Sequence, residues 1–347
     1  MRIIIIGGAG FIGINAAYYF LNKGHEVIIV DNLSRPGSDY NINRLLEKHK
    51  ISFINCDIRD FASLSKIFIN NANIDSVLLL AGQVAVTTSV TNPREDFEIN
   101  ALGTFNVLES IRLSEQNPLI IYSSTNKVYG KMDDLAVSLN GKRYCYDEME
   151  SGINENRQLD FYSPYGCSKG AGEQYVRDYS RIYNMKTTVF RQSCIYGPNQ
   201  FGIEDQGWVA WFTIATLLKK KFTIYGDGNQ IRDVLFVDDL VKLYELAMKN
   251  TNICSGEIYN VGGGIENTLS LNELVDILAI RFSTTLVPSK DDWRPGDQKV
   301  YISDVNKISK ALGWKPKTDI HEGINKMAEW IEENNEIIKF HVFENKK

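Results

Sequence analysis

The sequence predicts an α/β protein, a doubly wound parallel sheet followed by a smaller mixed α/β C-terminal lobe. In roughly the first 190 residues, short β-branched runs alternate with longer amphipathic segments, and the short runs are almost continuously apolar. Such alternation indicates βαβ units, and continuous apolar character is typical of parallel strands that helices cover on both faces. The length of 347 residues suits about two domains.

The elements follow in order along the chain. We expect strands at residues 2–6, 26–30, 51–55, 76–80, 119–123 and 185–190, and helices at 11–23, 42–50, 61–70, 93–114 and 164–183. Residues 131–160 are polar and carry Asn140-Gly141 as a turn signal, so we interpret them as an inserted loop. Later helices are expected at 207–221, 238–249, 270–281, 304–312 and 320–332, and short strands at 222–225 and 233–236. The predicted domains are residues 1–190 and the smaller lobe 191–347.

Composition and charge exclude several classes of protein. With 38 basic and 43 acidic residues the net charge is −5, so the chain offers no basic surface for nucleic acid or an anionic membrane. Five cysteines and four histidines are scattered without a CxxC pair, which argues against a disulfide framework and a metal site. The N-terminal apolar run is too short for a signal sequence, and no run reaches the ~20 apolar residues of a membrane span. We expect a cytoplasmic protein without metal, membrane or nucleic-acid partners.

A glycine-rich turn between the first strand and the first helix predicts dinucleotide binding. Gly7, Gly10 and Gly13 allow a tight turn and the close approach of a pyrophosphate, which N–H groups at the helix N-terminus bind. Asp31 ends the second strand 18 residues after Gly13. Its carboxylate would accept hydrogen bonds from ribose hydroxyls and repel a 2′-phosphate, so we predict a Rossmann domain that binds NAD. Arg35 nearby weakens this preference slightly.

Tyr165 and Lys169 form a candidate catalytic pair. They stand four residues apart and so share one face of the expected helix. A phenol has a reference pKa of ~10, so it needs a nearby cation to act as a general base near pH 7. The alternative is a tyrosine that packs on a lysine stem, but the position after the fifth strand of a dinucleotide fold favours catalysis.

Hydroxyl residues at the end of the fifth strand face the expected ligand crevice. Thr125 is placed to bind the reacting sugar oxygen, with Ser123 two residues before it. The alternative is a turn whose hydroxyls satisfy their own backbone. Asn126 and Lys127 follow Thr125 and are not a carboxylate pair, so the chain lacks the acid and base for eliminating water.

Together these residues resemble the extended branch of the short-chain dehydrogenase/reductase superfamily, over nearly the whole chain. That branch contains NAD-dependent nucleotide-sugar epimerases and dehydratases. Its dehydratases carry Thr-Asp-Glu in place of Thr125-Asn126-Lys127, which disfavours dehydration. A narrower resemblance, to the CDP-tyvelose (CDP-paratose) 2-epimerases, lies in residues 31–35, 81–85, 96–100, 123–130, 163–170 and, most specifically, 205–209.

The resemblance implies an isomerase that inverts C2 of a CDP-linked 3,6-dideoxyhexose through a 2-keto sugar. The alternatives are a 4-epimerase of another nucleotide-sugar, such as UDP-glucose, and a non-catalytic NAD sensor, which has no need for Thr125, Tyr165 and Lys169. Lys169 is expected to lower the pKa of Tyr165 and to bind the nicotinamide ribose. The resemblance also implies a homo-oligomer.

Further site residues follow from the resemblance. Arg232 and Arg294 match its phosphate-binding arginines, whose guanidinium groups suit a diphosphate. The alternatives are that both arginines lie on the surface, that Leu80 and Trp208 pack in the core, and that Asn100 braces a helix. The cofactor-binding residues are expected to be Gly7, Gly10, Phe11, Ile12, Gly13, Asp31, Asn32, Ser34, Arg35, Asp57, Ile58, Leu80, Ala81, Gln83, Asn100, Ser123, Tyr165, Lys169 and Gln192. The substrate-binding residues are expected to be Thr125, Ser193, Gly207, Trp208, Val209, Thr223, Tyr225, Arg232 and Arg294.

Overall fold

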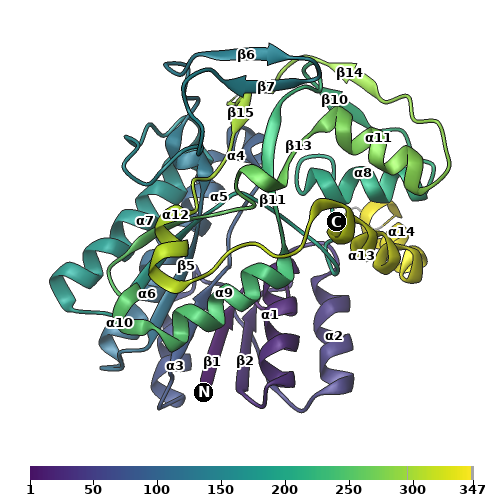
Figure 1. Cartoon of the computed structure of the whole chain (residues 1–347). Coiled ribbons are helices and arrows are strands. Elements are labelled where there is room, and N and C mark those ends of the chain that lie inside the picture. The colour runs from purple at the N-terminus through teal and green to yellow at the C-terminus, as the bar shows by residue number, and fades with distance from the viewer. Residues whose placement is uncertain (295, 345–347) are drawn as a thin grey trace.

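A seven-stranded parallel sheet forms the centre of the protein (Figure 1). The computed structural model describes residues 1–294 and 296–344. The strand order is β12-β8-β5-β4-β1-β2-β3, and every neighbouring pair is parallel. The strands are β1 Arg2–Ile6, β2 Glu26–Asp31, β3 Ser52–Asn55, β4 Ser76–Leu79, β5 Leu119–Thr125, β8 Thr187–Gln192 and β12 Ile258–Val261. The predicted fold class is confirmed.

Helices cover both faces of this sheet, which explains why its strands are apolar throughout. Ile3 and Ile5 pack into one buried cluster, and Ile4 and Ile6 pack into the other. The first cluster lies under α1 Phe11–Asn22, α2 Ser38–Lys48, α9 Val237–Lys249 and α12 Asn306–Leu312. The second lies under α3 Phe61–Asn70, α6 Gly103–Leu113 and α7 Pro164–Tyr183.

The strand order places a ligand crevice beside β1. From β1 the chain runs outward to β2 and β3, and then crosses back to β4 on the other side of β1. Where the strand order reverses in this way, a crevice forms at the carboxyl ends of the two adjacent strands, here β1 and β4, because their following connections leave in opposite directions. The glycine-rich turn follows β1 and Leu80 follows β4, so both predicted segments border this crevice.

The segment between β4 and β5 is more broken than the single helix predicted at residues 93–114. It contains α4 Val86–Thr91, α5 Pro93–Phe97, a π-helical turn η1 Glu98–Leu102 and then α6. Asn92 separates the first two helices, because its side chain caps α5 and Pro93 begins it. The π-helical turn holds Asn100, and such turns are frequent at functional sites.

The inserted residues 131–160 contain a hairpin where a loop was expected. Strands β6 Val137–Asn140 and β7 Arg143–Tyr146 pair antiparallel around the predicted Asn140-Gly141 turn. The phenol of Tyr146 donates to the carbonyl of Val300 at 2.8 Å, and the N–H of Tyr144 donates to the carbonyl of Asn229 at 3.1 Å. The hairpin therefore lies against the C-terminal part of the chain.

The C-terminal part builds its own apolar cluster around small sheets. Its strands are β9 Cys194–Tyr196, β10 Thr223–Tyr225, β11 Ile231–Phe236, β13 Thr268–Ser270, β14 Ser289–Asp291 and β15 Val300–Tyr301. Its longer helices are α8 Trp208–Leu217, α11 Leu271–Arg281 and α13 Ile320–Glu333, and its shorter ones are α10 Thr251–Cys254, η3 Ile265–Asn267, α14 Asn335–Lys339 and η4 Phe340–Glu344. The short turn η2 Asn126–Tyr129 instead follows β5 directly. The division at residue 190 stays a prediction, but α9 and β12 lie in the layers of the large sheet.

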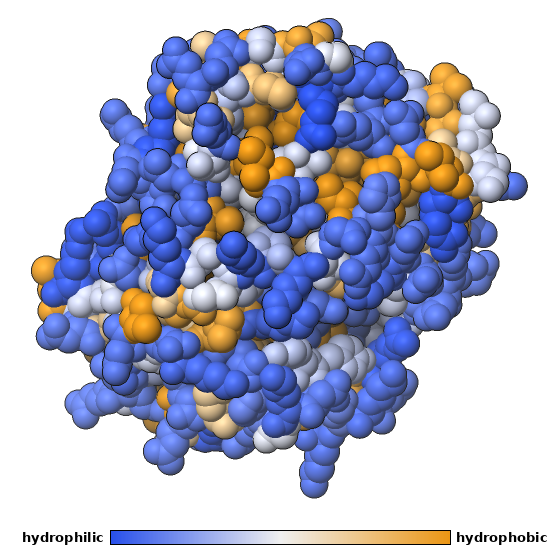
Figure 2. Space-filling model, viewed as in Figure 1, coloured by the Kyte–Doolittle hydropathy of each residue, from blue (hydrophilic) through white to orange (hydrophobic). Residues whose placement is uncertain are grey.

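The surface is largely hydrophilic on the face seen in Figure 2, where apolar residues form several separate groups. Among the residues that the structure describes, no helix combines the length and the apolar character needed to span a bilayer. The same residues contain no group of three or more histidine, cysteine or acidic side chains suited to a metal ion.

Candidate functional site

The glycine-rich turn meets the loop after β4 at very short distance. Gly7 has a φ of +83°, and a Cβ atom there would lie 2.6 Å from the backbone N of Ala81. A Cβ atom on Gly13 would lie 2.3 Å from the carbonyl oxygen of Gly7. No side chain fits at either position, so these glycines let the N-terminus of α1 open directly into the crevice.

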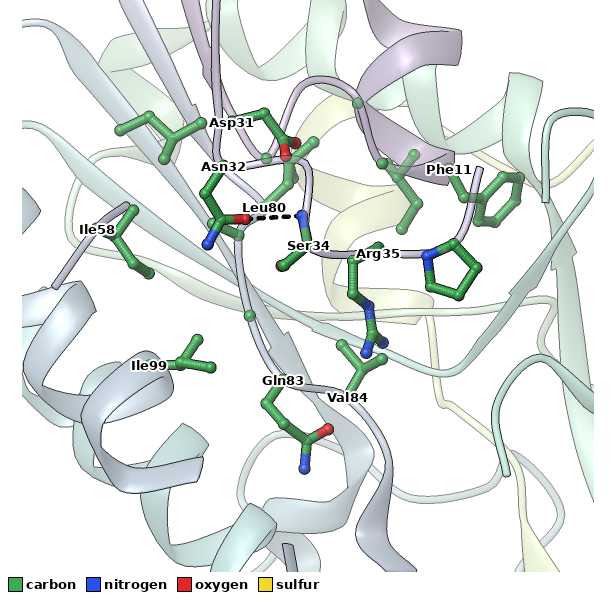
Figure 3. Close-up of a pocket in the computed structure, with 18 of the residues that line it drawn as sticks. Phe11, Asp31, Asn32, Ser34, Arg35, Ile58, Leu80, Gln83, Val84 and Ile99 are labelled. Carbon is green, nitrogen blue, oxygen red and sulfur yellow. Dashed lines mark hydrogen bonds between the residues drawn. The ribbon is translucent and has the colours of Figure 1, made fainter. Parts of the chain in front are cut away.

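A cavity of about 320 Å³ occupies this crevice. Figure 3 shows the side chain of Arg35 pointing into it, with Ile58 and Ile99 on the opposite side from Phe11. The predicted cofactor residues that line it are Gly7, Gly10, Phe11, Ile12, Gly13, Asp31, Asn32, Ser34, Arg35, Asp57, Ile58, Leu80, Ala81 and Gln83. These predicted residues therefore lie together around one cavity, whereas Asn100, Ser123, Tyr165, Lys169 and Gln192 of the same prediction do not line it.

Two acidic residues line the cavity: Asp31 is the last residue of β2, and Asp57 follows β3. The buried carboxylate of Asp31 accepts hydrogen bonds from the N–H groups of Ala9 at 3.0 Å and Leu33 at 2.8 Å. Burial raises the pKa of Asp31, and these N–H donors oppose that effect. The Arg59 side chain holds the pKa of Asp57 down, at about 2. Both carboxylates border the cavity, and their binding of a nucleoside stays a prediction.

Thr125, Tyr165 and Lys169 are all buried and do not themselves line the cavity. The hydroxyl of Thr125 is close enough to Tyr165 to lower its pKa by hydrogen bonding. A Cβ atom on Gly82, which lines the cavity, would lie 3.8 Å from Nζ of Lys169. A hydroxyl, a phenol and an amine thus converge beside the cavity.

Burial dominates the electrostatics of this group. It raises the pKa of Tyr165 to about 12, against the lowering effects of Thr125 and Arg35. It also lowers the pKa of Lys169 to about 7, against the raising effects of Asp96 and Glu173. The expected lowering of the Tyr165 pKa is therefore not a property of the chain alone, and a further positive charge beside the phenol is needed to produce it.

Behind Lys169 lies a buried polar network that the sequence prediction missed. The fully buried carboxylate of Asp96 accepts from Ser168 Oγ, and from the side-chain amides of Gln83 and Asn100 at 3.1 Å each. Asn100 also accepts from the N–H of Gln83 at 3.0 Å and does not line the cavity. Asn100 therefore braces the loop after β4. An acidic residue four positions before Asn100 on a helix was the available signal.

Comparison with known proteins identifies the family. The GDP-mannose 4,6 dehydratase family matches residues 4–327. The chain belongs to this family. It is 43% identical to a CDP-paratose 2-epimerase of Salmonella typhi, over 95% of the chain and 99% of that protein, which confirms the resemblance found in the sequence.

Two solved structures of epimerases and dehydratases share its fold. A UDP-glucose 4-epimerase of Thermotoga maritima, with UDP-glucose, has a TM-score of 0.82 and 31% identity, and covers 96% of this chain and 100% of its own. A dTDP-glucose 4,6-dehydratase of Streptomyces venezuelae, with NAD bound, has a TM-score of 0.83 and 26% identity. The match covers 97% of this chain and 98% of that chain. These proteins carry out different reactions, so family membership alone does not decide the chemistry here.

The family's cofactor fits the residues present. The cradle formed by Gly7 and Gly13 excludes any Cβ atom, the α1 N-terminus opens into the cavity, and Asp31 borders it. Of the remaining predicted cofactor residues, Ser123 lies on β5 and Gln192 ends β8. Gln192 donates to the phenol of Tyr244 at 2.9 Å, so its amide is engaged inside the sheet layer.

A loop from the C-terminal part closes one side of the cavity, and the sequence prediction did not assign it to the cofactor. Arg35 donates to the side-chain oxygen of Gln206, which joins the two parts of the chain. The cavity residues that were not predicted are Ile6, Val30, Pro36, Cys56, Gly82, Val84, Thr88, Glu95, Ile99, Asn199, Gln200, Phe201, Gly202 and Gln206. Only tertiary packing places residues 199–206 there.

The predicted diphosphate-binding arginines lie in the C-terminal part and are both paired. Arg232 lies 3.8 Å from the carboxylate of Asp297, and Arg294 lies 2.9 Å from that of Asp205. The guanidinium of Arg294 also stacks 3.8 Å from the ring centroid of Tyr225.

The other predicted substrate residues surround this region or support it. Ser193 donates to the carbonyl of Asp233 at 2.9 Å, and Trp208 donates to Sγ of Cys194 at 3.5 Å. Gly207 caps α8 at a φ of +72°, Thr223 begins β10, and Val209 is buried in the apolar cluster. Their roles toward a substrate stay predictions.

Proposed function

We propose that this protein is an NAD-dependent nucleotide-sugar epimerase that inverts C2 of a CDP-linked 3,6-dideoxyhexose through a transient 2-keto sugar. The observation that carries the proposal is the convergence of Thr125, Tyr165 and Lys169 beside a cavity built for a dinucleotide. The 43% identity to a CDP-paratose 2-epimerase supports the choice of C2 and of the CDP group.

The chain supplies positioning and proton transfer. NAD, when bound, supplies the acceptor and donor of hydride and a positive charge beside Tyr165. Tyr165 takes the proton of the C2 hydroxyl and later returns it, while Thr125 orients that hydroxyl. Lys169 holds the nicotinamide ribose, and Asp96 keeps a negative charge behind Lys169. Burial of all three catalytic side chains excludes water from the keto intermediate.

Dehydration is disfavoured by the residues that follow Thr125. Asn126 is buried, and the side chain of Lys127 is a cation, so neither supplies a carboxylic acid or carboxylate for removing water. The alternative function is a 4-epimerase, which the likeness to UDP-glucose 4-epimerases favours. Both reactions require the same three side chains.

Product analysis distinguishes these reactions. The purified protein is incubated in D₂O with CDP-linked 3,6-dideoxyhexoses and, separately, with UDP-hexoses, and the products are read by NMR. We expect inversion at C2 of the CDP-sugar, no deuterium at C2, and no net NADH, because the substrate's own hydride returns. Inversion at C4 would establish the alternative. Loss of water, net NADH or deuterium at C2 would contradict the proposal.

A further inference from the structure

Lys127 carries a positive charge into the space between Thr125 and the predicted diphosphate-binding arginines. It lies in η2, directly after β5, and its N–H donates to Oγ1 of Thr125 at 3.2 Å. Its partly buried side chain runs to the segment before β15, where Nζ donates to the carbonyl of Gly296 at 3.3 Å. One short turn therefore holds both the proposed hydroxyl-orienting group and this ammonium group.

The charges around Lys127 do not balance. Asp297 is the nearby acid, and Arg232 lies 3.8 Å from its carboxylate. Burial lowers the pKa of Lys127 to about 8, repulsion from Arg232 adds to the effect, and Asp297 opposes it. Within the described residues Lys127 has no ion pair of its own, so two cations share one carboxylate. Such an excess of positive charge away from water favours the binding of an anion.

The hydrogen bond that Lys127 makes is a weak one. Bonds from an ammonium to an anionic oxygen are typically about 2.7–2.9 Å long, whereas the bond to the neutral carbonyl of Gly296 measures 3.3 Å. A ligand oxygen with negative charge would therefore replace this partner at a gain in free energy.

We propose that Lys127 binds the phosphate next to the sugar in the nucleotide-sugar and so holds the sugar over Thr125 and Tyr165. The inference rests on the proposed function only for the substrate class, a sugar linked to a nucleoside diphosphate. Arg232 and Arg294 then bind the diphosphate from the C-terminal part of the chain, and Lys127 binds it from the catalytic side. If Lys127 had only a structural role, it would hold η2 against Gly296. Its replacement would then affect the binding of ligands with one phosphate and with two phosphates equally.

Calorimetry with CDP and CMP tests this assignment, because CMP lacks the phosphate next to the sugar. The variants are Lys127→Met and Lys127→Arg in the full chain with its cofactor, and the control is Lys142→Met, an exposed lysine in the β6–β7 turn that pairs with Asp276. We expect Lys127→Met to weaken CDP binding about tenfold or more and CMP binding less than about twofold. Lys127→Arg should retain most of the affinity, and Lys142→Met should match the parent protein.

The pH dependence gives a second readout. Groups that face the ammonium are Arg232 from β11, Asp297 before β15 and the Cys194 thiol from β9, whose pKa burial raises. Because the ammonium loses its proton as the pH rises through about 8, CDP affinity of the parent protein should fall there. That fall should be absent in Lys127→Arg, since arginine stays charged.

Several results would overturn the assignment. They are an equal loss of CDP and CMP affinity in Lys127→Met, no loss at all, or a CDP affinity of the parent that does not change between pH 7 and 9. The assignment would also be overturned if the parent protein bound none of the four diphosphates CDP, UDP, GDP and dTDP. The readout is binding, so an absence of C2 inversion would contradict the proposed function and leave the Lys127 comparison valid for whichever diphosphate binds.

Discussion

Tyr165 shows how strongly the environment of one side chain controls this site. Its phenol is buried, and burial raises its pKa to about 12 even though Thr125 and Arg35 lower it. A phenol with that pKa is almost wholly protonated near neutral pH. In the proposed mechanism, proton acceptance by Tyr165 therefore depends on the positive charge that a bound oxidised cofactor would bring, which would couple the base to the cofactor.

Replacing Tyr165 by phenylalanine removes the proposed base and keeps the ring. We expect Tyr165→Phe to lower kcat by ~10²–10⁴, the usual contribution of general acid–base catalysis, with little change in thermal stability. Steady-state kinetics on the nucleotide-sugar and a melting curve measure both effects. Tyr162→Phe, at an exposed position three residues earlier, is the control. A turnover near that of the control would remove Tyr165 from this role.

Asp31 is expected to set the preference for NAD. Its buried carboxylate borders the cavity, where it would accept from ribose hydroxyls and repel a 2′-phosphate. Loss of this charge in Asp31→Ala should reduce the preference for NAD over NADP by roughly 10- to 100-fold, as judged from titrations with both cofactors. Glu47→Ala, an exposed acidic position on α2, should leave the ratio unchanged. An unaltered ratio in Asp31→Ala would point to another determinant.

At the scale of elements, two glycines at the junction of β1 and α1 have different expected roles, one in the stability of the fold and one in cofactor binding. Gly13 is enclosed by backbone atoms at 2.3–2.9 Å from a Cβ position, whereas a Cβ atom on Gly10 would lie 3.3 Å from one carbonyl oxygen. Gly10 has a φ of −69°, which alanine adopts freely, and it lines the cavity. The same substitution should therefore act differently at the two positions.

We expect Gly13→Ala to destabilise the protein by about 1–3 kcal/mol or more, because backbone atoms have to shift. Gly10→Ala should leave stability within about 1 kcal/mol but weaken NAD binding roughly tenfold or more, since its methyl group keeps the pyrophosphate from the α1 N-terminus. Denaturant unfolding and a cofactor titration give the two quantities. Equal effects at both glycines would contradict this separation.

Helix α7 aligns the proposed catalytic residues Tyr165 and Lys169. Ser163 caps it by accepting from the N–H of Gly166 at 3.0 Å, and residues 165, 169 and 173 then recur at the four-residue spacing of one helix side. Glu173 is fully buried and forms an ion pair with Arg191 of β8. This pair fixes α7 against the sheet, so it positions Tyr165 and Lys169 without touching the cavity.

At the scale of the whole molecule, exposed apolar side chains gather on two neighbouring helices, α6 and α7. The ring of Phe105 contacts that of Tyr175 at 5.5 Å between centroids, which joins the helices. The exposed side chains are Leu113, Tyr175, Ile182 and Tyr183. Exposed apolar groups of this kind are typical of protein interfaces, which supports the predicted homo-oligomer.

A charge on this face should dissociate the oligomer. We expect Ile182→Glu to shift the protein toward monomer in sedimentation experiments, because an interface would bury the carboxylate without a partner. Ile280→Glu, at an isoleucine on α11 that is more exposed, is the matched control and should leave the assembly unchanged. A monomeric parent protein, or dissociation by the control alone, would argue against this interface.

Much of the cofactor site was predictable from local sequence. The positions of Gly7, Gly10 and Gly13, the acid Asp31 at the end of a strand, and the Tyr165–Lys169 spacing all depend on one turn, one strand end or one helix. Local rules of backbone geometry determine these features, so the sequence by itself identified the fold class and, with the family resemblance, half of the residues that line the cavity.

Tertiary structure alone decided the remaining features. Asp96 meets Ser168 across 72 positions, Arg35 meets Gln206 across 171, and Lys127 meets Gly296 across 169. The pKa values of Tyr165 and Lys169 also depend on burial by elements far apart in the chain. Desolvation and long-range pairing are properties of the packed molecule, and no short sequence pattern encodes which distant groups will surround a side chain.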